Sequence, residues 1–136
     1  MRFQDKVVVV TGAGQGLGAG FAKDFAAEGA QVVLVGRTAA KVEKVADEIN
    51  AAGGKALPLG CDVGKPEEVE RCFHSIFERF GRVDILINNA AYHKSLSVVD
   101  TSVEEWSKQI NTNLNGTFYC TKAVLPGMIE RRYGKI

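Results

Sequence analysis

The stretch Thr11-Gly12-Ala13-Gly14-Gln15-Gly16-Leu17-Gly18 follows a continuous β-branched run over residues 6–11. That run predicts a strand buried on both faces of a parallel sheet. Apolar side chains then recur three and four positions apart until Gly29, which predicts an α-helix. A glycine-rich turn between a strand and a helix places backbone N–H groups where they can bind a pyrophosphate. The stretch therefore predicts dinucleotide binding, and a P-loop is excluded because no Gly-Lys-Ser/Thr follows.

Strand and helix patterns alternate along the rest of the chain. Further strands are predicted over residues 31–35, 55–60 and 83–87. The helix that begins at Pro66 has the most regular apolar spacing in the sequence. This alternation implies a parallel sheet with right-handed crossovers, in an open doubly wound α/β fold of Rossmann type. We expect one domain over residues 1–136, with the strand order 3-2-1-4.

The last third of the chain is predicted to be mostly helical. A polar loop over residues 88–102 leads to a short helix over 103–110, and we expect Pro126 to kink the long helix that follows. One face of that long helix carries the apolar side chains of Leu114, Phe118, Leu125 and Met128 with Ile129. Residues 134–136 have the pattern of a fifth strand that is just beginning.

Composition and charge exclude several classes of protein. The chain has 46% hydrophobic and 24% charged residues, values that exclude disorder, collagen and coiled coil. Its 17 basic and 16 acidic residues give no field that would hold a nucleic acid. No apolar run approaches the about 18 residues of a membrane span or the core of a signal peptide. We expect a cytoplasmic protein that binds neither nucleic acid nor membranes.

The three cysteines, Cys61, Cys72 and Cys120, are too few and too widely spaced for a disulfide framework or a zinc site. We expect them to be buried thiols in a reducing compartment, and we predict no metal site.

The loop after the second strand predicts which dinucleotide binds. A carboxylate about 20 residues after the glycines would bind the ribose 2′-hydroxyl of NAD. Gly36 stands in that region instead, followed by Arg37 and Thr38, with Lys41 one turn on. An uncharged residue followed by arginine suits a 2′-phosphate, which Arg37 would bind through charge-assisted hydrogen bonds. We predict NADP(H), with NAD(H) as the alternative cofactor; the structural alternative is a solvated arginine ahead of a helix.

Four motifs in the same order resemble the short-chain dehydrogenase/reductase family. They are Thr11-Gly12-x3-Gly16-x-Gly18, Cys61-Asp62-Val63, Asn88-Asn89-Ala90-Ala91 and Asn113-Leu114-Asn115-Gly116-Thr117-Phe118. The similarity covers the whole chain, and it is greatest to members that resemble acyl-carrier-protein ketoreductases and sugar or polyol dehydrogenases. Two positions depart from the family pattern, because Ala91 replaces a glycine and Gln15 is not the basic residue of some NADP-dependent members.

The resemblance implies a role for each matched residue. The glycines would approach the cofactor phosphates, Asp62 would accept a hydrogen bond from the adenine amino group, and Val63 would pack against that ring. Asn113 would hold a water molecule in a proton relay and is the one predicted catalytic residue. The predicted cofactor site comprises Gly12, Gly14, Gln15, Gly16, Leu17, Gly18, Arg37, Thr38, Asp62, Val63, Asn89, Ala90 and Ala91. The structural alternatives are a turn-forming Asp62 and a polar strand end at residues 88–89.

The family's proton donor is absent from this sequence. The family reaction needs a serine and a Tyr-x3-Lys pair, in which the tyrosine is the general acid/base. None of the three tyrosines, Tyr92, Tyr119 and Tyr133, has a lysine four residues later. We therefore expect little or no turnover from these residues alone, and we interpret the chain as a truncation of a longer polypeptide.

The leading hypothesis is the cofactor-binding part of an NADP(H)-dependent oxidoreductase that passes hydride to or from a carbonyl or alcohol carbon. One alternative is a catalytically inactive nucleotide-binding or assembly module. Another is an S-adenosylmethionine-dependent methyltransferase, which is disfavoured because Thr11 and Gly36 stand where it needs acidic residues. The resemblance also implies a homo-oligomer, a dimer or tetramer, formed through the long helix. The substrate and the direction of the reaction stay open.

Overall fold

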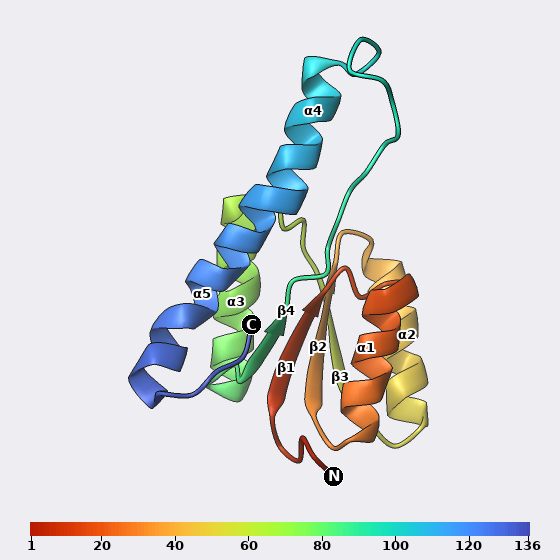
Figure 1. Ribbon diagram of the computed structural model, residues 1–136. Helices are drawn as coiled ribbons and strands as arrows, with labels where there is room; N and C mark the ends of the chain where they lie inside the picture. Colours follow the sequence, from red (N-terminus) through yellow and green to blue (C-terminus); the bar gives the residue numbers. More distant parts are fainter.

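A parallel four-stranded sheet forms the centre of the computed structural model, which describes residues 1–136 (Figure 1). The strands are β1 (Val7–Thr11), β2 (Gln31–Gly36), β3 (Lys55–Gly60) and β4 (Ile85–Ile87). The helices are α1 (Gly16–Ala27), α2 (Ala39–Ala51), α3 (Pro66–Phe80), α4 (Val103–Ile110) and α5 (Gly116–Arg131), with a π-helical segment η1 (Asn111–Asn115) before α5. The strands lie in the order β3-β2-β1-β4, which confirms the predicted doubly wound fold and strand order.

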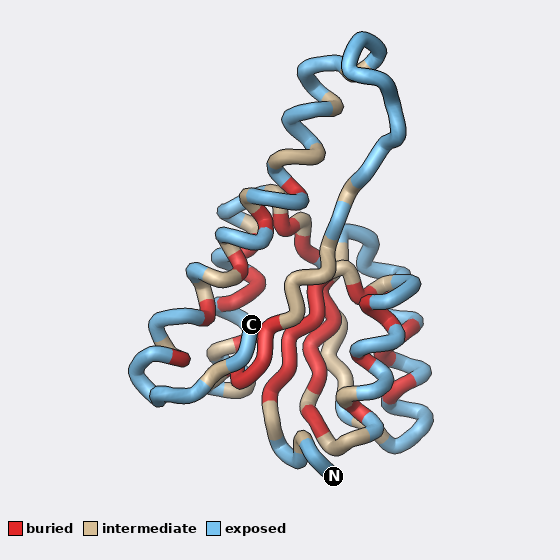
Figure 2. The backbone as a smooth tube through the Cα atoms, viewed as in Figure 1, coloured by how far each residue is buried: buried red, intermediate tan, exposed pale blue.

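β1 and β2 are buried on both faces, β3 is only partly buried, and alternate residues of the inner strands enter different cores. Val8 and Val10 of β1 contribute to a core with α1 and α2, whereas Val9 contributes to a core with α3 and α5. Figure 2 shows β1 and β2 as a buried layer between these two pairs of helices, with β3 at the edge only partly buried. Burial on both faces explains why β1 is a continuous apolar run rather than an alternating one.

β4 begins at Ile85, two residues later than predicted, and Asp84 directly before it makes side-chain contacts. The Asp84 carboxylate is 1% exposed and accepts a hydrogen bond from the backbone N–H of Val7 at 2.9 Å. Its other oxygen lies 2.9 Å from Nη2 of Arg82. On the outer side of β4, Lys135 forms a single parallel bridge with Ile85, so the predicted fifth strand is present only as one paired residue.

The long helix differs from its prediction in two ways. Its first residues form η1 rather than α-helix. α5 contains Pro126 and ends at Arg131, and the kink expected at Pro126 stays a prediction. The predicted apolar face is also exposed, because Leu114 and Phe118 are 63% and 59% accessible. The buried face instead carries Cys120, Val124 and Met128, so Met128 does not share the face of Ile129.

Residues 92–110, here called the arm, project beyond the sheet (Figure 1). They comprise a loop and α4, whose bounds match the helix predicted over 103–110. α4 has no buried residue, and Ser102 caps it by accepting a hydrogen bond from the Glu105 N–H at 3.0 Å. No helix in the structure combines the length and the apolar character needed to cross a membrane.

Candidate functional site

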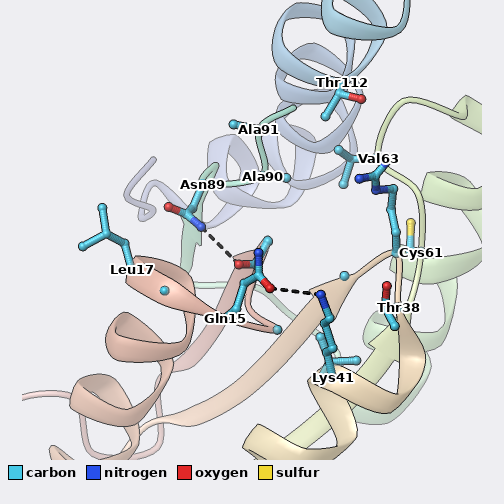
Figure 3. A pocket seen from close by; sticks show the side chains of 16 residues that line it. Gln15, Leu17, Thr38, Lys41, Cys61, Val63, Asn89, Ala90, Ala91 and Thr112 are labelled. Atoms are coloured by element: carbon cyan, nitrogen blue, oxygen red, sulfur yellow. Dashed lines mark hydrogen bonds between the residues drawn. The ribbon is translucent and has the colours of Figure 1, made fainter. Parts of the chain in front are cut away.

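A pocket of about 350 Å³ opens beyond the carboxyl ends of the strands (Figure 3). Its walls are the four loops that follow β1, β2, β3 and β4, together with Thr112 of η1. In a doubly wound sheet this edge is the place where ligands bind. Most of the predicted cofactor-binding residues line it: Gly12, Gly14, Gln15, Gly16, Leu17, Arg37, Thr38, Val63, Asn89, Ala90 and Ala91.

The loop after β1 places backbone atoms without side chains at the floor of the pocket, because it is rich in glycine. Gly12 has a φ of +62°, and a Cβ there would come within 2.8 Å of the Ala90 Cα, so both conformation and space require glycine. α1 begins at Gly16, and its N-cap residue Gln15 makes no side-chain capping bond. The first N–H groups of α1 therefore remain available for an anion, and the first turn carries no acidic side chain.

Gly18 does not line the pocket but lies beneath it, in the first turn of α1. A Cβ at Gly18 would overlap the carbonyl oxygen of Gly12 and would lie 2.6 Å from Nδ2 of Asn89. The absence of a side chain therefore lets α1 pack directly against the glycine-rich loop.

A buried hydroxyl joins the loops after β1 and β4. Thr11, 1% exposed, accepts hydrogen bonds through Oγ1 from the backbone N–H groups of Asn89 at 3.0 Å and Ala90 at 2.9 Å. In return, Nδ2 of Asn89 donates to the carbonyl oxygens of Thr11 and Gly12, both at 3.2 Å. Asn88 donates to Oγ1 of Thr121 on α5 at 3.2 Å. These bonds fix the relative positions of two pocket walls.

The loop after β2 gives one side of the pocket a positive charge. Arg37 and Lys41 are exposed and line the pocket, and no acidic side chain is among the 16 lining residues. Lys41 Nζ donates to Oε1 of Gln15 at 3.0 Å (Figure 3). Thr38 is the N-cap residue of α2, but its hydroxyl makes no capping bond. This side of the pocket therefore favours an anionic ligand.

The loop after β3 contributes buried apolar surface. Val63 and Cys61 line the pocket and are 5% and 3% exposed. A hydrogen bond with Cys72 and burial raise the pKa of the Cys61 thiol well above its usual range, so the thiol stays neutral. Asp62 does not line the pocket. Its Oδ1 accepts a hydrogen bond from the Gly64 N–H at 2.9 Å, which is the turn-forming role given above as the structural alternative.

Asn113, the predicted catalytic residue, lies in η1 and outside the lining of the pocket. Its side-chain amide pairs with the backbone of Tyr92: Oδ1 accepts from the Tyr92 N–H at 2.7 Å, and Nδ2 donates to the Tyr92 carbonyl at 2.8 Å. Its own carbonyl accepts a hydrogen bond from the Thr117 hydroxyl at 3.0 Å. The side chain is thus engaged in holding the start of the arm.

Five lining residues lie outside the predicted set: Gly36, Lys41, Val42, Cys61 and Thr112. Gly36, the last residue of β2, and Lys41, in the first turn of α2, had a sequence signal, because they flank the loop that was predicted to select the cofactor. Val42 is part of the apolar stripe of α2 and reaches the pocket because Gly36 has no side chain; a Cβ there would lie 2.8 Å from Val42 Cγ1. Such three-dimensional proximity has no local sequence signature.

Known proteins share both the sequence and the fold. The family model described as short chain dehydrogenase matches residues 6–136. The chain is 39% identical over 132 residues to meso-2,3-butanediol dehydrogenase of Serratia marcescens, covering 97% of this chain and 52% of that protein. It is 38% identical over 136 residues to (2S)-[(R)-hydroxy(phenyl)methyl]succinyl-CoA dehydrogenase subunit BbsD of Thauera aromatica, covering 100% of this chain and 55% of that protein.

Among solved structures, a metagenomic short-chain oxidoreductase in complex with NADP superimposes with a TM-score of 0.95 at 32% identity. That match covers 98% of this chain and 61% of the other. The chain spans about half the length of the curated relatives it matches. On the strength of the family match over residues 6–136, the chain belongs to the short-chain dehydrogenase family of oxidoreductases.

Proposed function

We propose that this chain binds NADP(H) and forms the cofactor-binding part of an enzyme that transfers hydride to or from a carbonyl or alcohol carbon. The observation that carries the proposal is the charge of the pocket, in which two cationic side chains and an uncapped helix N-terminus occur without any carboxylate. Relatives named as dehydrogenases of a diol and of a hydroxyacyl-CoA support a small alcohol or carbonyl substrate.

The pyrophosphate would bind at the glycine-rich loop. The free N–H groups at the start of α1 supply hydrogen-bond donors, and the helix dipole favours a negative charge there. Gly12 and Gly16, with φ of +62° and +56°, let the backbone turn closely at this point. These residues bind and orient the cofactor without taking part in the chemistry.

Arg37 and Thr38 would bind the 2′-phosphate. Arg37 makes no hydrogen bond or ion pair to another side chain, so its N–H donors are free for phosphate oxygens. Lys41 adds a second positive charge to the same side, next to the uncharged Gln15. Each charge-assisted hydrogen bond contributes about 1.5–3 kcal/mol, enough to favour NADP(H) over NAD(H) by about tenfold or more.

The adenine would lie against Val63. Asp62 Oδ1 is engaged with the Gly64 N–H, which leaves Oδ2 to accept from the adenine amino group. The nicotinamide would exchange hydride with the substrate when the cofactor is bound. Asn113 stays a predicted proton-relay residue, and in this structure its side-chain amide holds the Tyr92 backbone. We expect little turnover from these 136 residues, because the sequence has no Tyr-x3-Lys pair to move the proton.

Calorimetric titration of an Arg37→Ala variant tests the 2′-phosphate assignment. We expect NADPH affinity to fall about 10- to 100-fold while NADH affinity changes by less than about twofold. Arg71→Ala is the matched control, because Arg71 is exposed on α3 and does not line the pocket. The same titration with S-adenosylmethionine tests the alternative that the pocket binds the methyltransferase cofactor. An equal loss of NADPH and NADH affinity in Arg37→Ala would show that Arg37 does not recognise the 2′-phosphate.

We also infer a homo-oligomer formed through the exposed apolar face of η1 and α5. Leu114, Phe118 and Ile129 are 63%, 59% and 67% accessible, a large apolar area for one helical face. Light scattering coupled to gel filtration tests this inference. A dimer or larger in the unaltered chain and a monomer in Phe118→Asp are expected, whereas a monomeric unaltered chain would refute it.

A further inference from the structure

The Tyr92 ring contacts two cationic side chains from different parts of the fold. Cζ of Arg37, in the loop after β2, is 5.7 Å from the centroid of the Tyr92 ring. Nζ of Lys108, on α4, is 4.1 Å from the same centroid. Tyr92 directly follows Ala91, which lines the pocket, so the contact with Arg37 joins two walls of the pocket at its opening.

The Tyr92 ring is fixed at both ends. The amide of Asn113 holds its backbone through two hydrogen bonds of 2.7 and 2.8 Å. The hydroxyl donates to the Glu105 carboxylate, at 2.8 Å to one oxygen and 3.1 Å to the other. This hydrogen bond also raises the pKa of Tyr92, so the ring stays neutral near pH 7. An anchored neutral ring can hold a mobile cation without itself losing much freedom.

The geometry leaves Arg37 competent to bind phosphate. A guanidinium stacked on a ring presents its face to that ring and keeps its N–H donors along its edge. No side-chain acceptor occupies the Arg37 donors in this structure, and Glu105 is engaged with the Tyr92 hydroxyl. The contact with the ring therefore restricts the arginine side chain without occupying its N–H donors with another acceptor.

We propose that Tyr92 is a positioning residue for 2′-phosphate recognition, and that its ring holds the Arg37 guanidinium at the opening of the pocket. The proposal rests on the proposed function, since it requires Arg37 to bind the 2′-phosphate. Tyr92 itself does not touch the phosphate. A cation–π contact at an exposed site changes an equilibrium constant by about 2- to 5-fold, which sets the size of the expected effect.

Two small probes isolate this effect, because 2′,5′-ADP and 5′-AMP differ only by the 2′-phosphate. In Tyr92→Leu we expect the dissociation constant of 2′,5′-ADP to rise about 2- to 5-fold and that of 5′-AMP to stay within about 1.5-fold. Tyr92→Phe keeps the ring and should rescue 2′,5′-ADP binding. Tyr92→Gln is a second variant without a ring and should behave like Tyr92→Leu.

A double-mutant cycle separates positioning from a general structural role. When Arg37 is already alanine, Tyr92→Leu should leave 2′,5′-ADP binding unchanged, because the side chain that Tyr92 positions is gone. Full additivity in the cycle would overturn the proposal. So would equal losses for both probes, or tighter 2′,5′-ADP binding in Tyr92→Leu. If the unaltered chain binds both probes equally, the 2′-phosphate assignment itself fails, which is a different result.

Discussion

The sheet and the arm contain the same kinds of apolar side chain, but the sheet buries them and the arm exposes them. The four valines that begin β1 are at most 3% exposed, whereas Val98 and Val99 of the arm are 93% and 94% exposed (Figure 2). Each inner strand has a hydrogen-bonded neighbour on both sides and helices on both faces. The arm has no second layer against which to bury its side chains. Apolar character alone therefore does not create a core; a partner surface is also needed.

The cofactor pocket is built from the sheet and not from the arm. Its floor and walls are loops that leave buried strands, and bonds such as those of Thr11 hold them in place. The arm meets the pocket only at its first residues, where Tyr92 contacts Arg37. Substitutions in the sheet should therefore change stability and cofactor affinity together, while substitutions at arm residues that do not contact Tyr92, such as Val98 and Val99, should change neither.

The largest expected effect comes from adding one methyl group beneath the pocket. Gly18→Ala would place Cβ against the Gly12 carbonyl, so α1 must move away from the loop. We expect about 3 kcal/mol of destabilisation and a loss of NADPH binding. Gly20→Ala is the control in the same helix, because a Cβ there meets nothing within 4 Å. It should stabilise the fold by about 0.5–1 kcal/mol. Urea unfolding measures both, and similar values for the two variants would contradict the close packing.

Removal of the hydroxyl that joins two pocket walls should have the next largest effect. Thr11→Val leaves the Ala90 N–H without its acceptor and the Asn89 N–H with the Ile87 carbonyl alone. We expect the free energy of unfolding to fall by about 2–3 kcal/mol and NADPH affinity to fall with it. Thr11→Ser is the matched control, since it keeps the oxygen. If Thr11→Val retained full NADPH affinity, the loops would be held by other contacts.

Two valines test the comparison directly. Val9→Ala removes side-chain atoms that are 0% exposed and should cost about 2 kcal/mol. Val99→Ala makes the same change at a residue 94% exposed and should cost less than about 0.5 kcal/mol. Thermal and urea unfolding give both values. Equal costs would mean that the arm is packed against a surface, for instance in an oligomer.

The smallest effect concerns the hydrogen bond between Tyr92, at the start of the arm, and Glu105 of α4. The Glu105 carboxylate accepts from the phenol, which raises the pKa of Tyr92 above its ordinary value near 10. The neutral phenol is therefore favoured in the folded state, and its contribution is lost as the pH rises through the raised pKa. Glu105→Ala should shift the tyrosinate absorbance of Tyr92 to lower pH, with Tyr92→Phe as the spectral blank. An unchanged titration would show that the hydrogen bond is not formed in solution.

The sequence predicts this chain well where a property depends on neighbouring residues, or on the order of neighbouring helices and strands. The β-branched run before Thr11 indicates a doubly buried strand, and the glycines after it indicate a backbone turn with free N–H groups. The alternation of strands and helices indicates a parallel sheet, and the resemblance to the family adds the strand order that the structure shows. Most of the predicted site residues consequently line one pocket.

Long-range proximity is what the sequence does not reveal. The contact between Arg37 and Tyr92 joins residues of two different loops, and no spacing rule links them. The π-helical turn that points Asn113 at the Tyr92 backbone has no signature in the residues that form it. The apolar face of Leu114 and Phe118 has the spacing of a core face, yet it is exposed because nothing in the chain covers it.

The central claim is that the pocket distinguishes dinucleotides by a 2′-phosphate. Calorimetric titration of the unaltered 136-residue chain with NADPH and with NADH tests it most directly. We expect one NADPH bound per chain, with an affinity about tenfold or more above that for NADH. Equal affinity for the two cofactors, or binding of neither, would contradict it.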